Sequence, residues 1–259
     1  MVATMNRVRT IDFGAFDRAR YDTQFLYQGE SCVVIGSHVP AGLSAYGHHR
    51  HQHCDQLYYI VRGEMHVQLG TDVATAGPDT VVHIPRGLPH HNWNAGAVDE
   101  FHLEVLAPAP RANLPLATPT DDTDTAGLSA TIAPLDPAAY AESARFPGFA
   151  LNRPLRDGTS AHAALYVGTV QPGAGGPGTH VHEFDQCYFV LEGELTVEIG
   201  FDRHTVPPCS LVTIPAGVPH RQWNDGRTVE RHIALNTPLP ATDRPLDVGV
   251  SFVATGEVI

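Results

Sequence analysis

Lysine is absent from this 259-residue sequence, so all sixteen basic residues are arginine. Enzymes that form a Schiff base through a lysine, or that use lysine as a general base, are therefore excluded. Long apolar stretches are also missing, since none approaches the roughly 20 residues that a membrane-spanning helix needs. Residues 1–10 have no apolar core of the length found in signal peptides. We therefore expect a cytoplasmic protein without a membrane partner.

Cysteine is scarce, and none of its four copies forms a C-x-x-C pair. This spacing favours reduced, mostly buried thiols over a disulfide framework. The four residues are Cys32, Cys54, Cys187 and Cys209. Cys54 lies within a cluster of histidines, so a role as a metal ligand stays open for it.

Positive charge is in deficit, and the formal net charge is −12. A nucleic acid or an anionic membrane is therefore excluded as a partner, because its phosphates would be repelled. Hydrophobic residues make up 42% and charged residues 17%, with 24 glycines and 21 prolines. This composition is typical of a turn-rich, mostly β protein and not of a disordered chain. We expect a small-molecule substrate as the partner, and a homodimer stays open.

The sequence contains an internal repeat with an offset of 130 residues. Residues 55–64 (DQLYYIVRGE) match residues 185–194 (DQCYFVLEGE). At the same offset, residues 84–90 (IPRGLPH) match residues 214–220 (IPAGVPH), and a Trp-Asn pair follows each of them. A register held over some forty residues indicates a duplication, so two copies of one module are expected.

A stretch rich in proline, threonine and aspartate, residues 107–136, separates the two copies. Such stretches favour extended, solvated linkers that cross the surface. We place the boundary near residue 125. The expected divisions are an N-terminal domain at 1–110, a linker at 111–127 and a C-terminal domain at 128–259.

The pattern within each copy is that of β-strands, with no convincing helical periodicity. In the second copy, the even-numbered residues of segment 180–190 would share one face of a single strand, leaving the odd-numbered residues on the other face. Both faces carry bulky side chains, as expected for a strand with a barrel interior on one side and another sheet on the other. Residues 32–39 and 164–170 are expected to add a strand to each barrel. Short helices stay open near 12–20 and 137–144.

The histidines of the second copy converge by this parity. His180 and His182 would lie on the same strand face, close enough to chelate one ion, and Gln186 follows with the same parity. His220 comes after a Pro/Gly turn that redirects the chain. Three neutral nitrogens and one amide oxygen suit Fe(II), Mn(II), Ni(II), Co(II) or Zn(II), and ligand type alone does not choose among these metals.

These motifs resemble those of the cupin superfamily, which read G-x5-H-x-H-x3–4-E-x6-G and G-x5-P-x-G-x2-H-x3-N. The residues of the second copy that match them are His180, His182, Gln186, Gly193, Pro215, Gly217, His220 and Asn224. The leading glycines, Gly42 and Gly173, lie one residue further out than the pattern. The resemblance covers both copies and most of the chain outside the linker and tails. It implies an all-β bicupin, two tandem jelly-roll barrels, with two divalent metals per chain.

The first copy offers two His-x-His pairs, because it carries four histidines within six residues. Aligning the leading glycines of the copies selects His49 and His51, which leaves four residues before Gln56. A one-residue bulge then restores the strand parity. The alternative pair, His51 and His53, leaves only two residues, which is outside the family spacing. The first metal set is therefore expected to be His49, His51, Gln56 and His90.

Glutamine stands in both copies where most cupins carry glutamate. This departure resembles a subset of cupins that includes the bicupin isomerase of bacilysin biosynthesis. Four neutral ligands would leave the full 2+ charge on the metal, and an amide cannot act as the general base that glutamate provides in some cupin dioxygenases. The glutamine therefore favours chemistry in which the metal acts as a Lewis acid.

Two tyrosines of the repeat, Tyr58 and Tyr188, point inward by parity. They are candidates for substrate binding, either as wall residues or as proton donors. Packing or turn roles are expected for Trp93, Trp223, Asn94 and Asn224. For His102 and His232, which are also 130 residues apart, a core role is favoured and a catalytic role stays open.

The cupin barrel hosts many functions, so three classes are carried forward. The first is a dioxygenase-type oxidoreductase that acts on an enolic or phenolic compound. The second is a non-redox isomerase, cyclase or lyase of a natural-product pathway. The third is a non-catalytic protein that binds a small molecule. The sequence assigns no catalytic residue beyond the ligand sets.

Overall fold

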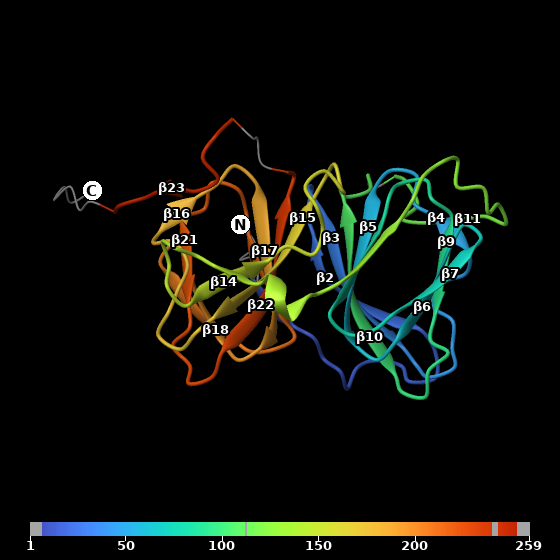
Figure 1. The fold of residues 1–259 in the computed structure, drawn as a ribbon, viewed down its shortest axis with the longest axis horizontal. Helices are drawn as coiled ribbons and strands as arrows, with labels where there is room; N and C mark the ends of the chain where they lie inside the picture. Colours follow the sequence, from blue (N-terminus) through green and yellow to red (C-terminus); the bar gives the residue numbers. More distant parts are fainter. Residues whose placement is uncertain (1–6, 112, 240–242, 253–259) are drawn as a thin grey trace.

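The computed structural model describes residues 7–111, 113–239 and 243–252, and it contains two β-barrels side by side (Figure 1). Within these ranges, the only helix is the single 3-10 turn η1, Pro137–Ala139, and the helix left open near 12–20 is absent because that segment forms turns. No helix among the described residues is long and apolar enough to cross a membrane. The prediction of an all-β protein with two tandem jelly-roll barrels is confirmed.

The first barrel is built from two antiparallel sheets. In spatial order, the six-stranded sheet contains β12 (Thr131–Pro134), β8 (Thr80–Ile84), β5 (Asp55–Arg62), β10 (Glu100–Ala107), β3 (Val33–Val39) and β2 (Asp22–Gln28). The five-stranded sheet contains β11 (Thr118–Pro119), β4 (His49–Arg50), β9 (His90–Trp93), β6 (Met65–Leu69) and β7 (Asp72–Ala76).

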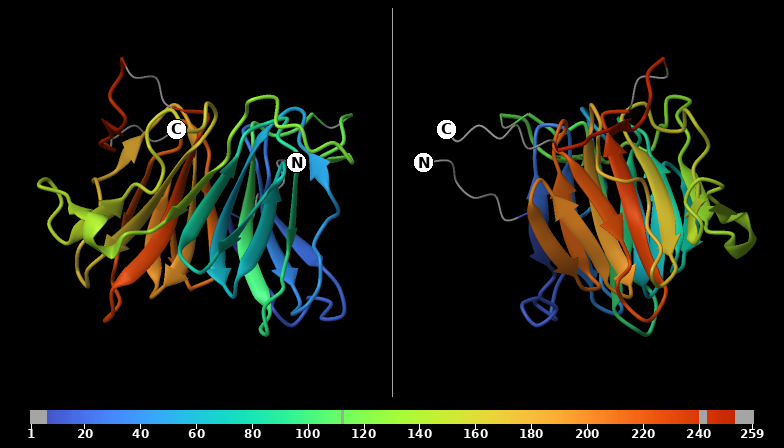
Figure 2. Two further views of the ribbon diagram at one scale, coloured as in Figure 1. Left: turned by 45° about the vertical axis from the view of Figure 1, so that its right-hand side comes forward. Right: turned by 90° about the vertical axis from the view of Figure 1, so that its left-hand side faces the viewer.

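The second barrel repeats this plan. Its seven-stranded sheet contains β1 (Val8–Thr10), β20 (Ser210–Ile214), β17 (Asp185–Glu192), β22 (Glu230–Thr237), β15 (Ala164–Val170), β14 (Phe149–Asn152) and β13 (Ala141–Glu142). Its five-stranded sheet contains β19 (Asp202–Val206), β18 (Leu195–Ile199), β21 (His220–Trp223), β16 (His180–Val181) and β23 (Val248–Gly249). Viewed along the long axis, the second barrel lies in front of the first (Figure 2, right).

The barrels exchange their first strands. The N-terminal strand β1 pairs with β20 of the second barrel, where Val8 lies opposite Val212. Conversely, β12 follows the linker but pairs with β8 of the first barrel, where Ile132 lies opposite Val82. Each exchange covers an edge that would otherwise present unpaired backbone groups. The divisions at residues 110 and 128 do not anticipate this crossing.

The central strands of both barrels are buried on two faces, as the bulky residues at both parities predict. On β5, Tyr58 packs into the interior of the first barrel, whereas Tyr59 packs into a core shared by the two barrels. On β17, Tyr188 and Phe189 divide in the same way. The shared core draws on both halves of the chain, so apolar burial between the barrels holds them together.

The repeated Asp-Gln pair places an aspartate at this junction. Asp55 accepts a hydrogen bond from the backbone N–H of Arg86 at 3.1 Å and another from the Ser160 hydroxyl of the second half at 2.8 Å. Asp185 accepts equivalent bonds from the Ala216 N–H at 2.9 Å and from the Ser31 hydroxyl of the first half at 2.5 Å. Each aspartate thus fastens the Pro/Gly turn that precedes a motif histidine, and also links the two barrels.

Candidate metal centres

Six histidines have their Nδ1 atoms fixed by the backbone. Each Nδ1 lies 2.5–2.9 Å from a carbonyl oxygen, which can only accept, so Nδ1 carries the proton and Nε2 keeps a free lone pair. The pairs are His49 with Gly47, His51 with Leu116, His90 with Leu88, His180 with Gly178, His182 with Phe184, and His220 with Val218. Metal-binding imidazoles are oriented in this way in metalloproteins generally.

In the first barrel, these bonds bring His49, His51 and His90 together. His49 on β4 lies opposite His90 on β9, with the ring centroids 4.2 Å apart. All three side chains are buried, and their candidate ligand atoms lie within 4.8 Å of one another. His53 is exposed and lies outside this group. The structure therefore places the predicted pair His49 and His51 at the centre, and not the alternative pair.

Cys54 does not join this cluster. Its side chain packs with Val33, Ile35 and Leu106 in a small apolar core, and all four cysteines are free thiols. Burial raises the pKa of Cys54 to about 12, so the thiol keeps its proton. The ligand role left open for Cys54 is not supported.

Gln56, near the start of β5, lines the same cavity as His49 and His51. Its Nε2 donates to the buried Glu104 carboxylate at 2.6 Å, and its Oε1 is buried without a hydrogen-bond partner among the described residues. Because a carboxylate oxygen accepts and does not donate, Glu104 selects the amide orientation that leaves Oε1 free. An amide held in this way offers an oxygen ligand.

In the second barrel, His180, His182 and His220 form the corresponding cluster. His180 on β16 lies opposite His220 on β21, and their ring centroids are 4.2 Å apart. The ligand atoms of the three side chains again lie within 4.8 Å of one another. The two clusters confirm the expectation of two metal-binding sets per chain.

The single strand predicted for residues 180–190 is wrong. β16 ends at Val181 and β17 begins at Asp185, and the two strands belong to different sheets. The His182 Nδ1 bond to the Phe184 carbonyl closes a bend between them, and the two rings stack with centroids 4.0 Å apart. The chain turns here because a closed barrel needs a corner where it passes from one sheet to the other.

Gln186 adds an acceptor beside this cluster. Its Nε2 donates to the Asn236 Oδ1 at 3.0 Å, and its Oε1 lies 3.3 Å from the Nε2 of His182. Since His182 is protonated at Nδ1, two acceptors face each other across this distance with no proton between them. A cation would satisfy both atoms, so the arrangement fits a metal.

Burial keeps the imidazoles in the form that binds metal. Burial lowers the pKa of His49 to about 4 and that of His220 to about 3, and it places the pKa of His90 well below its usual value. The Nε2 atoms of His51, His90 and His220 have no hydrogen-bond partner among the described residues. Buried acceptors without partners are costly, and coordination of a divalent ion removes this cost.

Segments that follow the last strand of each repeat close both clusters. In the first barrel, β11 pairs with β4, and the Leu116 carbonyl just before it accepts the bond from His51. In the second, β23 pairs with β16, and the Oδ1 of Asp247 lies 3.6 Å from the Nε2 of His180. Part of the linker, which includes Leu116 and β11, therefore covers the first cluster.

A cavity adjoins each cluster. The first has a volume of about 350 Å³ and is lined by His49, His51, Gln56 and Tyr58, among other residues. The second is larger, about 820 Å³, and its lining includes His180, Gln186 and Tyr188. Both tyrosines thus border a cavity as their parity indicates. Their rings contact His102 and His232 at centroid distances of 4.9 and 5.0 Å.

Glu104 is a site residue that the sequence analysis missed. It lines the first cavity on β10, and the 130-residue offset puts Ala234 at the same place in the second. Asn236, which binds Gln186, corresponds to Leu106. A signal was present, because a carboxylate interrupts the apolar run of β10 at the parity of His102. The duplicated sites therefore differ in the group behind the glutamine.

Comparison with known proteins agrees with this architecture. The Cupin_2 family model, described as a cupin domain, matches residues 37–105 and 166–232, together more than half of the chain. No curated protein matches the chain.

Solved structures share the fold at low identity. The chain is 11% identical to AerE from Microcystis aeruginosa, with a TM-score of 0.65 and coverage of 89% of this chain and 96% of that one. Against Bacillus subtilis oxalate decarboxylase, whose structure concerns Mn(II) centres, the identity is 14%, the TM-score 0.65 and the coverage 95% and 79%. Against salicylate 1,2-dioxygenase from Pseudoaminobacter salicylatoxidans, these values are 13%, 0.63, 80% and 69%. Likeness at this level shows the fold, and the two family matches together with the two histidine clusters establish that this chain belongs to the cupin family as a bicupin.

Proposed function

We propose that this bicupin is a metal-dependent enzyme that oxidises a small enolic or phenolic compound in a dioxygenase-type reaction. The observation that carries the proposal is the second cavity, which joins the histidine cluster to a space of about 820 Å³. This volume falls within the range of roughly 300–1,000 Å³ typical of small-molecule sites. The proposed metal ligands are His180, His182, Gln186 and His220, with His49, His51, Gln56 and His90 as the first set.

The walls of the second cavity suit a weakly acidic, largely apolar substrate. Phe149 and Leu165 contribute buried apolar surface, which excludes water. Arg153 lies over the Tyr166 ring at 5.2 Å and would attract an enolate or phenolate oxygen. Two arginines and two aspartates line the cavity, so it has no large net charge. This balance fits an enol or phenol better than a polyanion.

Tyr188 is the proposed hydrogen-bond donor to the substrate. Burial raises the pKa of its hydroxyl above the ordinary value, so the group stays protonated at neutral pH. A divalent ion held by His180, His182, Gln186 and His220 would supply a Lewis acid for the reaction of the substrate with O₂. Tyr188 would then hold a hydrogen bond to that substrate oxygen, while the apolar walls fix the plane of the substrate.

The test is an oxygen-electrode assay on protein reconstituted with each candidate metal, using flavonols, β-diketones and catechols as substrates. We expect substrate-dependent oxygen uptake with at least one metal, and its loss in a His180→Ala/His220→Ala variant. Substrate turnover without oxygen uptake would overturn the dioxygenase assignment. It would support instead a non-redox isomerase, cyclase or lyase.

The neutral glutamine ligands favour the second candidate, a non-redox isomerase, cyclase or lyase. The substitution Gln186→Glu tests this candidate. We expect the variant to retain metal, because an anionic oxygen is the better donor. Turnover should nevertheless fall about tenfold or more, a barrier change of about 1.4 kcal/mol, because the added charge weakens the Lewis acid. Metal analysis and steady-state rates on the same preparation separate the two effects. A Gln186→Glu variant as active as wild type would contradict the neutral-ligand argument.

Glu104→Ala tests how the first site is held, since it introduces the residue that the second half has at this position. We expect metal affinity at the first site to fall about tenfold or more, as for other groups that orient a ligand, because the Gln56 amide is freed to rotate. The measurement is a competitive metal titration in the His180→Ala/His220→Ala background. Glu104→Gln, which keeps an acceptor for Gln56, is the matched control and should lose less. Equal affinity in wild type and Glu104→Ala would contradict the role assigned to Glu104.

A further inference from the structure

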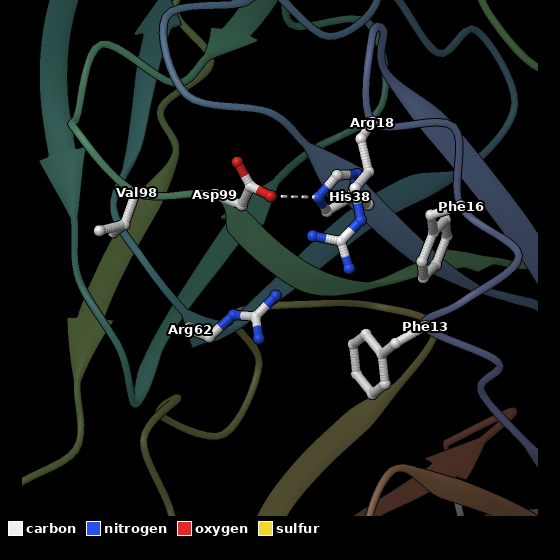
Figure 3. A pocket seen from close by; sticks show the side chains of 7 residues that line it. All are labelled: Phe13, Phe16, Arg18, His38, Arg62, Val98 and Asp99. Carbon is white, nitrogen blue, oxygen red and sulfur yellow. Dashed lines mark hydrogen bonds and ion pairs between the residues drawn. The ribbon is translucent and has the colours of Figure 1, made fainter.

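The first barrel has another cavity, which none of the histidines of its cluster lines (Figure 3). Its volume is about 400 Å³. Arg62, at the last position of β5, lines this cavity, whereas Gln56 at the second position of the same strand lines the metal-site cavity. Six residues of extended chain separate the two by roughly 20 Å. The two cavities share no lining residue, so they are separate sites.

Two arginines direct their guanidinium groups into this space. Arg18 enters from the N-terminal segment and Arg62 from β5 (Figure 3). Neither makes an ion pair or a side-chain hydrogen bond within residues 7–111, 113–239 and 243–252. Both arginines are exposed, so water hydrates their charges and weakens the repulsion between them. Their N–H groups are therefore free to donate to an anion that enters this space.

The single carboxylate in the lining is already engaged. The Oδ2 of Asp99 lies 3.0 Å from the Nε2 of the buried His38, and its Oδ1 accepts from the backbone N–H of Ala41 at 3.2 Å. Asp99 can offset only one of the two arginine charges. The cavity thus keeps an excess positive charge, which suits a ligand with one negative charge.

Phe13 and Phe16 line the side of the cavity away from Val98 and Asp99 (Figure 3). The guanidinium of Arg62 lies over the Phe13 ring at 5.6 Å, which leaves the N–H groups at its edge free to donate. Phe16 lies 6.1 Å from Phe13 and stacks on His38 at 5.3 Å, measured between ring centroids. A flat apolar group could pack here while its anionic end meets the arginines.

Among the residues that the structure describes, the second barrel has no equivalent arrangement. Glu192 stands at the position that corresponds to Arg62. Arg231 binds Glu192 at 2.7 Å and Asp79 of the first half at 2.8 Å. Its charge is therefore neutralised by two carboxylates of the chain, so within the described residues the unpaired arginines belong to the first barrel and do not follow from the repeat.

We propose that this cavity binds a small organic carboxylate with an aromatic body. The carboxylate accepts hydrogen bonds from Arg18 and Arg62, and the ring packs against Phe13 and Phe16. The site is distinct from both metal centres, and the proposal does not depend on the reaction that they carry out.

The test uses zinc-loaded full-length protein with benzoate as the probe and benzyl alcohol as its neutral counterpart. Backbone amide NMR during a titration should show saturable shifts at Phe13, Val98 and Asp99 with benzoate. Benzyl alcohol should bind about tenfold more weakly or worse, because it lacks the charge-assisted hydrogen bonds. Arg62→Ala and Arg18→Ala should each weaken benzoate binding by about tenfold.

Arg20→Ala is the matched control, because Arg20 belongs to the same segment but pairs with Asp17 outside the cavity. It should bind benzoate like wild type. The proposal is overturned if benzoate shifts only residues at the metal sites, or if both probes bind wild-type protein equally well. Since the probe comparison needs no variant, it decides the matter even if a substitution disturbs folding.

Discussion

Wild-type protein reconstituted with Fe(II), Mn(II), Co(II), Ni(II) or Zn(II) is expected to hold about two metal ions per chain, and a His180→Ala/His220→Ala variant about one. The reason is that each half presents three buried imidazoles whose Nδ1 protons are fixed and whose Nε2 atoms converge. Removing two of three nitrogens leaves too few ligands to retain an ion. Elemental analysis after desalting, with protein concentration from amino-acid analysis, measures the ratio.

The first site supplies the matched set of variants. His49→Ala/His90→Ala should also retain about one metal, and the fourfold combination none. His53→Ala is the control, since this exposed residue lies outside the cluster and should leave the ratio unchanged. Wild-type protein that stays metal-free after reconstitution with all five metals would contradict the metal-dependent function. If His53→Ala lost a metal while a single His49→Ala variant lost none, the ligand pair would be His51 and His53 instead.

The histidine clusters could be predicted because the same motif spacing occurs in both copies of the repeat, so each copy checks the assignment made in the other. His180 and His182 are unambiguous, and alignment of the copies carries their positions to His49 and His51. Strand parity was less informative. Strand parity predicts that Gln186 lies beside the histidines, and it does. The assumption behind that prediction, one continuous strand, is wrong, because a bend and a change of sheet separate Gln186 from His180 and His182. Local hydrogen bonds such as that of His182 to the Phe184 carbonyl decide such bends.

Other features could not be read from local pattern. Strands of two to four residues, such as β1, β11 and β23, are too short to show periodicity, and each forms only by pairing with a distant segment. The exchange of β1 and β12 between barrels therefore escaped prediction. The histidines next to Cys54 in sequence suggest a ligand role for it, yet its side chain lies in an apolar core with Val33. Proximity in sequence is a poor guide where successive side chains alternate between faces.

Replacing Phe189 by alanine is expected to lower the free energy of unfolding by about 3–5 kcal/mol, the usual cost of removing a fully buried phenylalanine. Phe189 is 1% exposed and belongs to the core shared by the two barrels. Chemical denaturation followed by circular dichroism measures the loss. Phe201→Ala is the control, because Phe201 is 84% exposed and its ring pairs with that of Phe252 outside the core. It should change the free energy by no more than about 0.5 kcal/mol.

Because the shared core contains residues from both halves of the chain, Phe189→Ala should destabilise both barrels. The two tryptophans, Trp93 on β9 and Trp223 on β21, report on one barrel each. In a Trp223→Phe background, fluorescence follows the first barrel alone, although Phe189 belongs to the second half of the chain. We expect Phe189→Ala to lower the denaturation midpoint reported by Trp93 as well as the midpoint reported by Trp223 in a Trp93→Phe background. If the Trp93 midpoint stayed unchanged while the Trp223 midpoint fell, the barrels would unfold independently, and the shared core would not couple them.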